Sequence, residues 1–333
     1  MATTFTSDET APEEPTPTEA DEPTLTDDAF ERLVGRLNQQ SVDKHFDAYV
    51  DVPWDELPVD RTDPRWQLGE LDPLGATEWY QSQPPEVRSA IGLHLVAAKA
   101  KTGLVFEQIL QRGLLDFAGG LPNNTPEFRY VVHEVIEEGH HTLMFQELVN
   151  RSGFDVPGLG GFDAVGARIV TMLARPFPAL FLMFVLGGED PIDHVQREAL
   201  KRGDAHPLLE RIMRIHVTEE ARHLSFARHW LKQNVPGLGR LRRTILAHAT
   251  PIILGTMSQM MLRPSRHVVE THGIPKQVVK AVYGTPEAQA RQAQAVRKVR
   301  KLCRELGLMA PTAARIWKAY GIYADDSSTA TTA

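Results

Sequence analysis

The chain has a single cysteine, Cys303, among its 333 residues. One cysteine excludes an internal disulfide, a four-cysteine iron–sulfur centre and a zinc ribbon within the chain. Such sparse cysteine is typical of the reducing cytoplasm, where we expect this protein to act. Hydrophobic residues make up 42% and charged residues 24%. This composition is ordinary for a packed globular protein and argues against a largely disordered one.

A strongly basic region is also absent. The net charge is −7, but residues 1–28 hold nine acids and no base, and the other 305 residues hold 34 acids and 36 bases. Because the net charge of residues 29–333 is close to zero, we expect no nucleic-acid partner. Thr, Glu and Pro dominate the N-terminal segment, so we expect disordered tails at residues 1–28 and 324–333, and no export signal.

Long apolar runs are few. Residues 177–188 are too short to span a bilayer, which needs roughly 20 residues. Residues 244–262 contain His248, Pro251 and Gln259, which suit a buried helix better than lipid. We therefore expect no membrane span.

Strand-like alternation is scarce, and apolar residues recur at three and four positions almost throughout. This pattern predicts an all-α protein in which residues 29–323 form one helical domain. Residues 45–84 are rich in Asp, Pro and Trp, and we expect them to form an irregular arm packed on that domain. Helices are expected near residues 27–44, 85–118, 126–150, 178–202, 207–234, 240–262, 275–283, 286–306 and 311–320.

Two segments, residues 137–141 and 219–223, spell Glu-Glu-x-x-His. The second glutamate of each follows a lone upstream glutamate by 31 positions, and one offset of 82 residues relates the two sets. A single Glu-x-x-His is common on solvated helices, whereas two equally spaced copies indicate a metal site. The candidate ligands are Glu107, Glu138 and His141 from the first copy, and Glu189, Glu220 and His223 from the second.

The equal spacing predicts two helical hairpins. In antiparallel helices joined by a short loop, ligands at one height lie equally far from the turn. The two midpoints fall within residues 119–126 and 203–207, which are rich in turn-forming residues. Two such hairpins make a ferritin-like four-helix bundle, with additional flanking helices, whose core at residues 85–235 holds two metal ions.

One histidine breaks the symmetry of the two copies. His216 lies four residues before Glu220 on the same helix face, where the first copy has Glu134. We take His216 as the candidate seventh ligand, although a lone histidine also forms ordinary hydrogen bonds in protein cores. A mixed carboxylate and imidazole set suits two iron ions, with manganese as the alternative metal.

Some assignments stay open at this level. Glu137 with His140 has the same spacing as Glu138 with His141, but the second copy has Arg222 where that register needs a histidine. The glutamates left outside the ligand set, either outer neighbours of the metals or exposed residues, are Glu134, Glu137 and Glu219.

Glycines and a proline surround Glu189, with Gly187 and Gly188 before it and Pro191 after it. Proline removes a backbone donor and glycine tolerates distortion. We therefore expect either a kink at this ligand or a helix that begins at Asp190.

With His216 included, the pattern resembles the AurF-type di-iron N-oxygenases, the p-aminobenzoate N-oxygenase family, which is distinguished by a third histidine on the last core helix. The resemblance covers residues 85–235, with Glu137 where the family often has aspartate. It implies that a reduced di-iron pair activates O2 and oxidises an arylamine, through hydroxylamine and nitroso stages, to a nitro group.

We therefore predict a cytoplasmic di-iron oxygenase acting on a small aromatic or apolar substrate, with a homodimer as one allowed assembly. No dinucleotide fingerprint is present, so the reaction needs an external electron donor. The rivals are a di-iron hydroxylase, desaturase or oxidase acting on another apolar molecule, and a ferroxidase without an organic product. Residues expected to line an apolar pocket, although such residues more often form plain core, are Phe145, Met172, Phe181, Phe184 and Met213.

Overall fold

The computed structural model describes residues 25–69 and 72–324, and within these ranges it contains helices and no strand. The predicted all-α class is confirmed. The expected tails fall mostly in residues 1–24 and 325–333, outside the described part of the chain. Helix α1 (Asp27–Asp43) nevertheless includes Asp27 and Asp28, which we had placed in the tail. Both carboxylates lie in its first turn, where the helix dipole favours negative charge.

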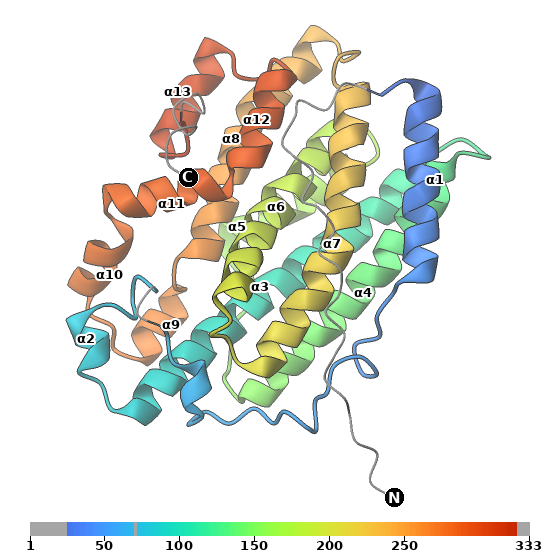
Figure 1. Ribbon diagram of the computed structural model, residues 1–333. Helices are drawn as coiled ribbons and strands as arrows, with labels where there is room; N and C mark the ends of the chain where they lie inside the picture. Colours follow the sequence, from blue (N-terminus) through green and yellow to red (C-terminus); the bar gives the residue numbers. More distant parts are fainter. Residues whose placement is uncertain (1–24, 70–71, 325–333) are drawn as a thin grey trace, which may run out of the picture.

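Four long helices form the bundle at the centre of the molecule (Figure 1). They are α3 (Pro85–Ala118), α4 (Pro126–Ser152), α6 (Pro178–Arg202) and α7 (Pro207–Asn234). The most extensive packing is of α3 on α4 and of α6 on α7, and α3 also contacts α6 while α4 contacts α7. The two predicted hairpins and the ferritin-like bundle are therefore present.

Each bundle helix begins with a proline, whose fixed φ suits the first turn and whose missing N–H has no partner to lose there. The connections at residues 119–125 and 203–206 lie where equal ligand spacing placed the turns. Gly203 ends α6 at φ +67°, a left-handed conformation that glycine adopts without steric cost.

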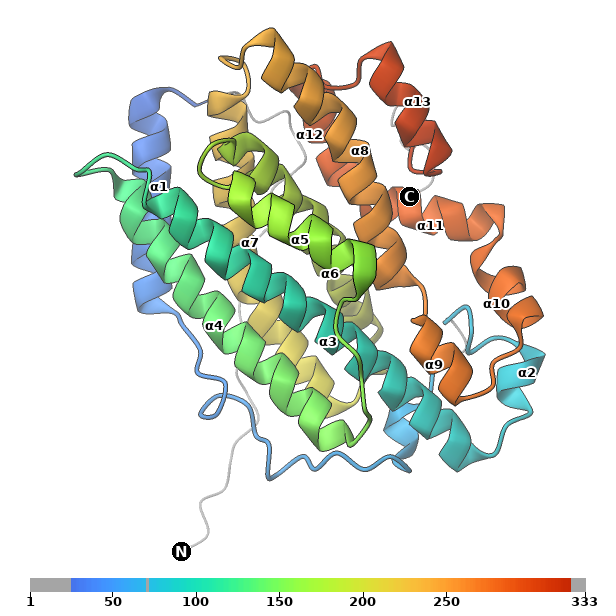
Figure 2. The same ribbon diagram turned by 180° about the vertical axis from the view of Figure 1, so that it is seen from behind.

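Further helices surround the bundle. In Figure 1, α1 lies along α4 and α7, and α8 (Arg240–Leu262) lies with α11–α13 on the opposite side. Figure 2 shows α5 (Gly161–Leu173) on the face formed by α3 and α6. The remaining elements are the 3₁₀ helix η1 (Pro64–Trp66) and helices α2 (Glu78–Gln81), α9 (Arg266–Thr271), α10 (Lys276–Tyr283), α11 (Pro286–Ala295), α12 (Arg297–Glu305) and α13 (Pro311–Ala319).

The segment at residues 45–84 is largely irregular and packs on the bundle, as predicted. The Trp66 indole stacks on the His206 imidazole with ring centroids 4.0 Å apart. The His206 ring in turn accepts a hydrogen bond from the backbone N–H of Leu208 at the start of α7. The Trp66 carbonyl presses against Gly92 of α3, where a Cβ would lie 1.8 Å from the oxygen. Only glycine fits there without moving the backbone.

The helix predicted at residues 286–306 is divided into α11 and α12 at Val296, whose φ of −96° and ψ of 10° leave the helical range. At this break the Ala293 carbonyl accepts a hydrogen bond from the buried Arg300 guanidinium at 2.7 Å. Helix α5 was not predicted, although its apolar residues recur at helical spacing; three of them, Val165, Ile169 and Met172, are exposed.

The helix start expected at Asp190 is wrong. Helix α6 continues through this region with Pro191 inside it. A Cβ at Gly188 would lie 1.9 Å from the Phe106 ring, so the glycine permits close packing of α3 on α6. The apolar run at residues 177–188 is buried in the protein core.

One segment of the described chain, Arg240–Thr271, is long and apolar enough to cross a membrane. Half of its most apolar window is buried inside the protein. Its main helix, α8, packs on α6 and α13. Other helices of the protein therefore cover the sides of α8 that face α6 and α13.

A histidine cluster around the buried His94 joins α3 to α9 and the turn after it. His94 Nδ1 lies 3.0 Å from His272 Nε2, its ring stacks on Phe154 at 4.1 Å, and the His267 ring lies 5.5 Å away. The Arg61 guanidinium covers the Phe154 ring. Burial, helped by the neighbouring cationic groups, lowers the pKa of His94 from 6.5 to about 4.

The His94 pKa predicts a loss of stability in mild acid. Because the folded-state pKa is depressed, the stabilisation is present above pH 6.5 and disappears as the pH falls toward 4. The free energy of unfolding of the wild-type protein should fall by about 2 kcal/mol between pH 7 and pH 5 because His94 becomes protonated. Urea unfolding of metal-free wild type and His94→Phe at both pH values measures it, and equal pH dependence in the two proteins would contradict it.

Candidate metal centre

The seven predicted ligands lie together inside the bundle, one on α3, two on α4, one on α6 and three on α7. None of these residues is more than 1% exposed. Their donor atoms form groups of three in which all atoms lie within 4.8 Å of one another. The groups that contain only predicted ligands are Glu107 with His141 and His216, Glu138 with His141 and Glu220, and Glu189 with His216 and Glu220. His223 belongs to a fourth group, with Glu134 and Glu138.

Two carboxylates from α4 and α7 lie at the centre of the cluster. His141 Nδ1 is 3.0 Å from Glu138 Oε2 and 3.5 Å from Glu220 Oε1. His223 Nδ1 is 3.0 Å from both Glu138 Oε1 and Glu220 Oε1. Both imidazoles therefore direct Nδ1 toward the same pair of carboxylates, as ligands of two neighbouring metal ions would.

The other nitrogen of each imidazole is held by a glutamate from the opposite hairpin. His141 Nε2 donates to Glu219 Oε2 at 2.9 Å, and His223 Nε2 donates to Glu137 Oε2 at 2.8 Å. Each Glu-Glu-x-x-His motif thus supplies the outer carboxylate for the histidine of the other motif. Such bonds fix the ring orientation and the tautomer that leaves Nδ1 available for metal.

The outer carboxylates share one cation. Arg222 Nη2 lies 2.8 Å from Glu137 Oε1 and 3.6 Å from Glu219 Oε1. Although burial opposes ionisation, the hydrogen bond from His223 and the charges of His223 and Arg222 lower the pKa of Glu137 to about 2. Glu137 and Glu219, left undecided by the sequence, are therefore buried partners of the histidines.

His140, the histidine of the alternative register, belongs to none of these groups of donor atoms. Its Nδ1 accepts a hydrogen bond from the Ala48 backbone N–H at 3.3 Å and lies 3.9 Å from Asp47 in the irregular arm. His140 therefore faces outward, while Glu138 and His141 face the interior of the bundle.

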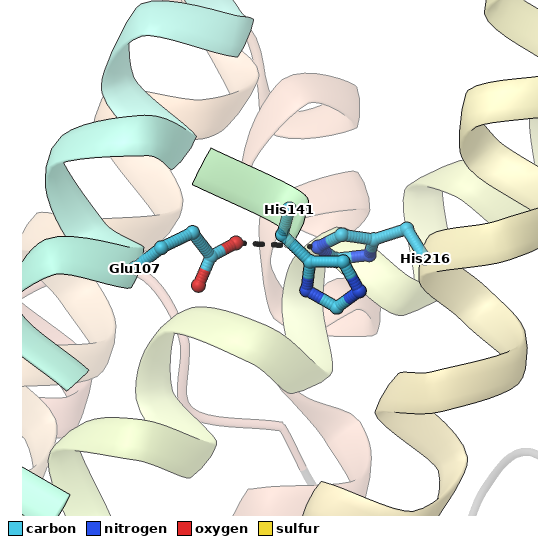
Figure 3. Close-up of side chains that lie close together, drawn as sticks. All are labelled: Glu107, His141 and His216. Atoms are coloured by element: carbon cyan, nitrogen blue, oxygen red, sulfur yellow. Dashed lines mark hydrogen bonds and ion pairs between the residues drawn. The ribbon is translucent and has the colours of Figure 1, made fainter. Parts of the chain in front are cut away.

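His216 lies at the edge of the cluster, next to Glu107 and Glu189. Figure 3 shows Glu107 of α3 and His216 of α7 reaching toward each other beside His141. His216 Nε2 lies 3.4 Å from Glu107 Oε1 and 3.9 Å from Glu189 Oε2. The ring also lies 4.6 Å from that of His141. Burial, together with the nearby His141, lowers the pKa of His216 well below its ordinary value, which favours the neutral, metal-ligating imidazole.

The electrostatics fit a bound divalent metal. Burial and neighbouring carboxylates raise the pKa values of Glu107 and Glu189 well above the ordinary range. One oxygen each of Glu107, Glu189 and Glu220 has no hydrogen-bond partner among the described residues. Buried carboxylates without partners are costly, and metal ions offset that cost. The oxygen and imidazole donors suit iron or manganese.

A cavity of about 200 Å³ adjoins the cluster, and Glu107, Glu189 and His216 form part of its wall. Of the five residues expected around a pocket, Phe145 and Met213 line it. The other three do not. Phe181 and Phe184 pack in the main core, and Met172 is 74% exposed on the outer side of α5.

The cavity wall also includes residues that were not predicted, among them Phe106 beside Glu107 and Ile192 three positions after Glu189. Helical periodicity around the ligands would have found Ile192. Phe181 was misplaced because its ring occupies the space beside Gly113, where a Cβ would lie 2.1 Å from that ring. This contact between α3 and α6 has no local signature in the sequence.

Comparison with known proteins places this cluster in a family. The sequence model described as p-aminobenzoate N-oxygenase AurF matches residues 27–307, which is most of the chain. The chain belongs to the p-aminobenzoate N-oxygenase family. The resemblance predicted from the duplicated motif and His216 is thereby confirmed.

Relatives of this N-oxygenase family member include uncharacterized proteins of Mycobacterium tuberculosis (strain CDC 1551 / Oshkosh) and Mycobacterium bovis (strain ATCC BAA-935 / AF2122/97). Each is 40% identical over 299 residues, covering 88% of this chain and 88% of the relative. No solved structure matches the chain significantly. The family is one of di-iron oxygenases with a ferritin-like fold, and the buried Glu and His groups of this member fit such a centre.

Removing an outer glutamate should weaken metal binding in this N-oxygenase family member. Glu219→Ala takes away the acceptor that orients His141, so we expect a 10- to 100-fold loss of Fe(II) affinity. Anaerobic Fe(II) titration measures the change. Glu147→Ala is the control, because Glu147 pairs with Arg151 on the same helix but outside the cluster. Unchanged affinity in Glu219→Ala would contradict the role.

Proposed function

We propose that this protein is a di-iron oxygenase that uses O2 to oxidise an aromatic amine toward a hydroxylamine or nitro product. The proposed iron ligands are Glu107, Glu138, His141, Glu189, His216, Glu220 and His223. The observation that carries the proposal is the cavity whose wall includes Glu107, Glu189 and His216. This cavity provides room for an organic molecule beside the proposed iron ligands.

Two bound ferrous ions would supply the electrons that activate O2. The four ligand carboxylates balance their charge. Glu107 and Glu189 would be among the ligands, because each has one carboxylate oxygen without a hydrogen-bond partner among the described residues. Glu137 and Glu219 hold the two central histidines in orientation. The apolar wall, which includes Phe106, limits water beside the reacting nitrogen.

We further propose that residues 29–323 act as one domain in the cytoplasm, with a small aromatic or apolar substrate, O2 and an external electron donor; a homodimer is an allowed assembly. Among the rival functions, a ferroxidase has no use for an apolar cavity that reaches the ligands. A hydroxylase, desaturase or oxidase would use the same cavity, so the product must separate these from N-oxygenation.

The test begins with protein reconstituted anaerobically with Fe(II), in which iron per chain is counted. ¹⁸O2 is then admitted with p-aminobenzoate and a panel of other arylamines, a chemical reductant is supplied, and products are analysed by mass spectrometry. About two irons and ¹⁸O on the amine nitrogen are expected. No bound iron would overturn the proposal, ¹⁸O on carbon would indicate a hydroxylase, and iron oxidation without any organic product would indicate a ferroxidase.

A further inference from the structure

Glu134 of α4 is buried in the bundle and is not explained by the seven proposed ligands. It lies one helical turn before Glu138 and is 1% exposed. Neither of its carboxylate oxygens has a hydrogen-bond partner within residues 25–69 and 72–324. A carboxylate so placed is costly unless a charge or a metal faces it.

Glu134 faces the cluster of proposed metal ligands. One of its oxygens, a carboxylate oxygen of Glu138 and a ring nitrogen of His223 lie within 4.8 Å of one another. This is the same compactness that relates the three groups made only of proposed ligands. Glu134 therefore meets the same distance limit as His216.

The internal duplication gives an independent reason for this placement. The offset of 82 residues that relates the two ligand sets maps Glu134 onto His216. His216 precedes Glu220 by one turn on α7, as Glu134 precedes Glu138 on α4. The two side chains therefore occupy equivalent positions in the two hairpins, one as an imidazole and the other as a carboxylate.

The surroundings of these equivalent positions differ. His216 forms part of the cavity wall, together with Glu107 and Glu189, whereas Glu134 does not contact that cavity. One turn before Glu134 lies Tyr130, which is fully buried in the main core against Phe226. Glu134 thus approaches the cluster from the closed side, away from the space available to substrate.

We infer that Glu134 is an eighth protein ligand, which binds the iron held by His223 on the side away from the cavity. This inference rests on the metal centre of the proposed function but not on the identity of its substrate. A fifth carboxylate adds negative charge to the centre and favours its ferric state. Loss of Glu134 should therefore weaken Fe(II) binding at one of the two positions and raise the reduction potential of that iron.

The experiment compares wild type, Glu134→Gln and Glu134→Leu, with Glu147→Gln as the matched control on the same helix. Anaerobic Fe(II) titration and Mössbauer spectra of ⁵⁷Fe-loaded protein are the readouts, and neither needs a substrate. For both Glu134 variants we expect one iron to bind at least about 10-fold more weakly and one Mössbauer component to change, with the control unchanged.

Several outcomes would overturn the inference. Wild-type affinity and an unchanged spectrum in Glu134→Gln would show that Glu134 is a buried acid that does not bind metal. Failure of wild type to bind iron would remove the eighth ligand along with the other seven. If wild type binds two irons but oxidises no arylamine, the proposed function fails while the Glu134 result still decides this inference. Circular dichroism of each metal-free variant checks that it folds. If Glu134→Gln does not fold, Glu134→Leu tests the same loss of the carboxylate with an apolar side chain.

Discussion

Replacing Glu138 by alanine should reduce bound iron from about two per chain to less than one. Glu138 contacts the Nδ1 atoms of both His141 and His223, so its loss removes the carboxylate common to the two halves of the centre. The expected affinity loss exceeds the 10- to 100-fold typical of outer neighbours, because a ligand itself is removed. Oxygenase activity should fall by at least about 1,000-fold. Elemental analysis after anaerobic loading and desalting measures the iron.

The same variant should lose the stabilisation that iron confers. A ligand that binds only the folded state raises its stability, so iron should raise the thermal midpoint of wild type but not of Glu138→Ala. Glu147→Ala should behave as wild type in both measurements, since its partner Arg151 lies outside the cluster. Two tightly bound irons in Glu138→Ala would show that the centre is elsewhere.

The second large effect concerns the cavity. Ile192 of α6 lies three residues after Glu189, lines the cavity and is only partly buried. Ile192→Trp should fill space that the substrate needs while leaving every proposed ligand in place. We expect at least a 100-fold lower kcat/KM for organic oxidation with about two irons still bound, because the substrate no longer reaches the metals. Steady-state kinetics and iron analysis of the same sample measure the two quantities.

Control variants keep the cavity result specific. Val165→Trp adds the same side chain on the exposed outer face of α5 and should leave kcat/KM unchanged. Met213→Trp alters a different part of the wall and provides a second test if Ile192→Trp loses iron or fails to fold. Full activity in a folded, iron-loaded Ile192→Trp would place the substrate outside this cavity.

The bundle and its cluster could be predicted because their signals are local and repeated. Apolar residues at helical spacing mark each long helix, and Pro85, Pro126, Pro178 and Pro207 mark where the four begin. The equal spacing of Glu107 with Glu138 and of Glu189 with Glu220 requires only that each hairpin turn lie midway. Helix α5 was missed even though its apolar residues recur at helical spacing.

Contacts between segments distant in the sequence were not predictable in the same way. The pairing of His141 with Glu219, and of His223 with Glu137, depends on how the two hairpins face each other. The cavity wall depends on which side chains α3, α6 and α7 bring together, and Phe181 was misplaced for that reason. The local sequence around Gly188 predicts a kink or a helix start, whereas in the structure this glycine leaves space for the Phe106 ring of α3.

The sequence by itself determined the helical class, the two hairpins and the residues that meet between them, because helical periodicity and turn position fix which side chains share a height and a face. It also identified the N-oxygenase family through His216. Only the tertiary structure decided which glutamates hydrogen-bond to the histidines, which side chains line the cavity and that Glu134 lies beside Glu138 and His223. Those features arise from the packing of one hairpin against the other, and the distances involved are set by side chains far apart in the chain.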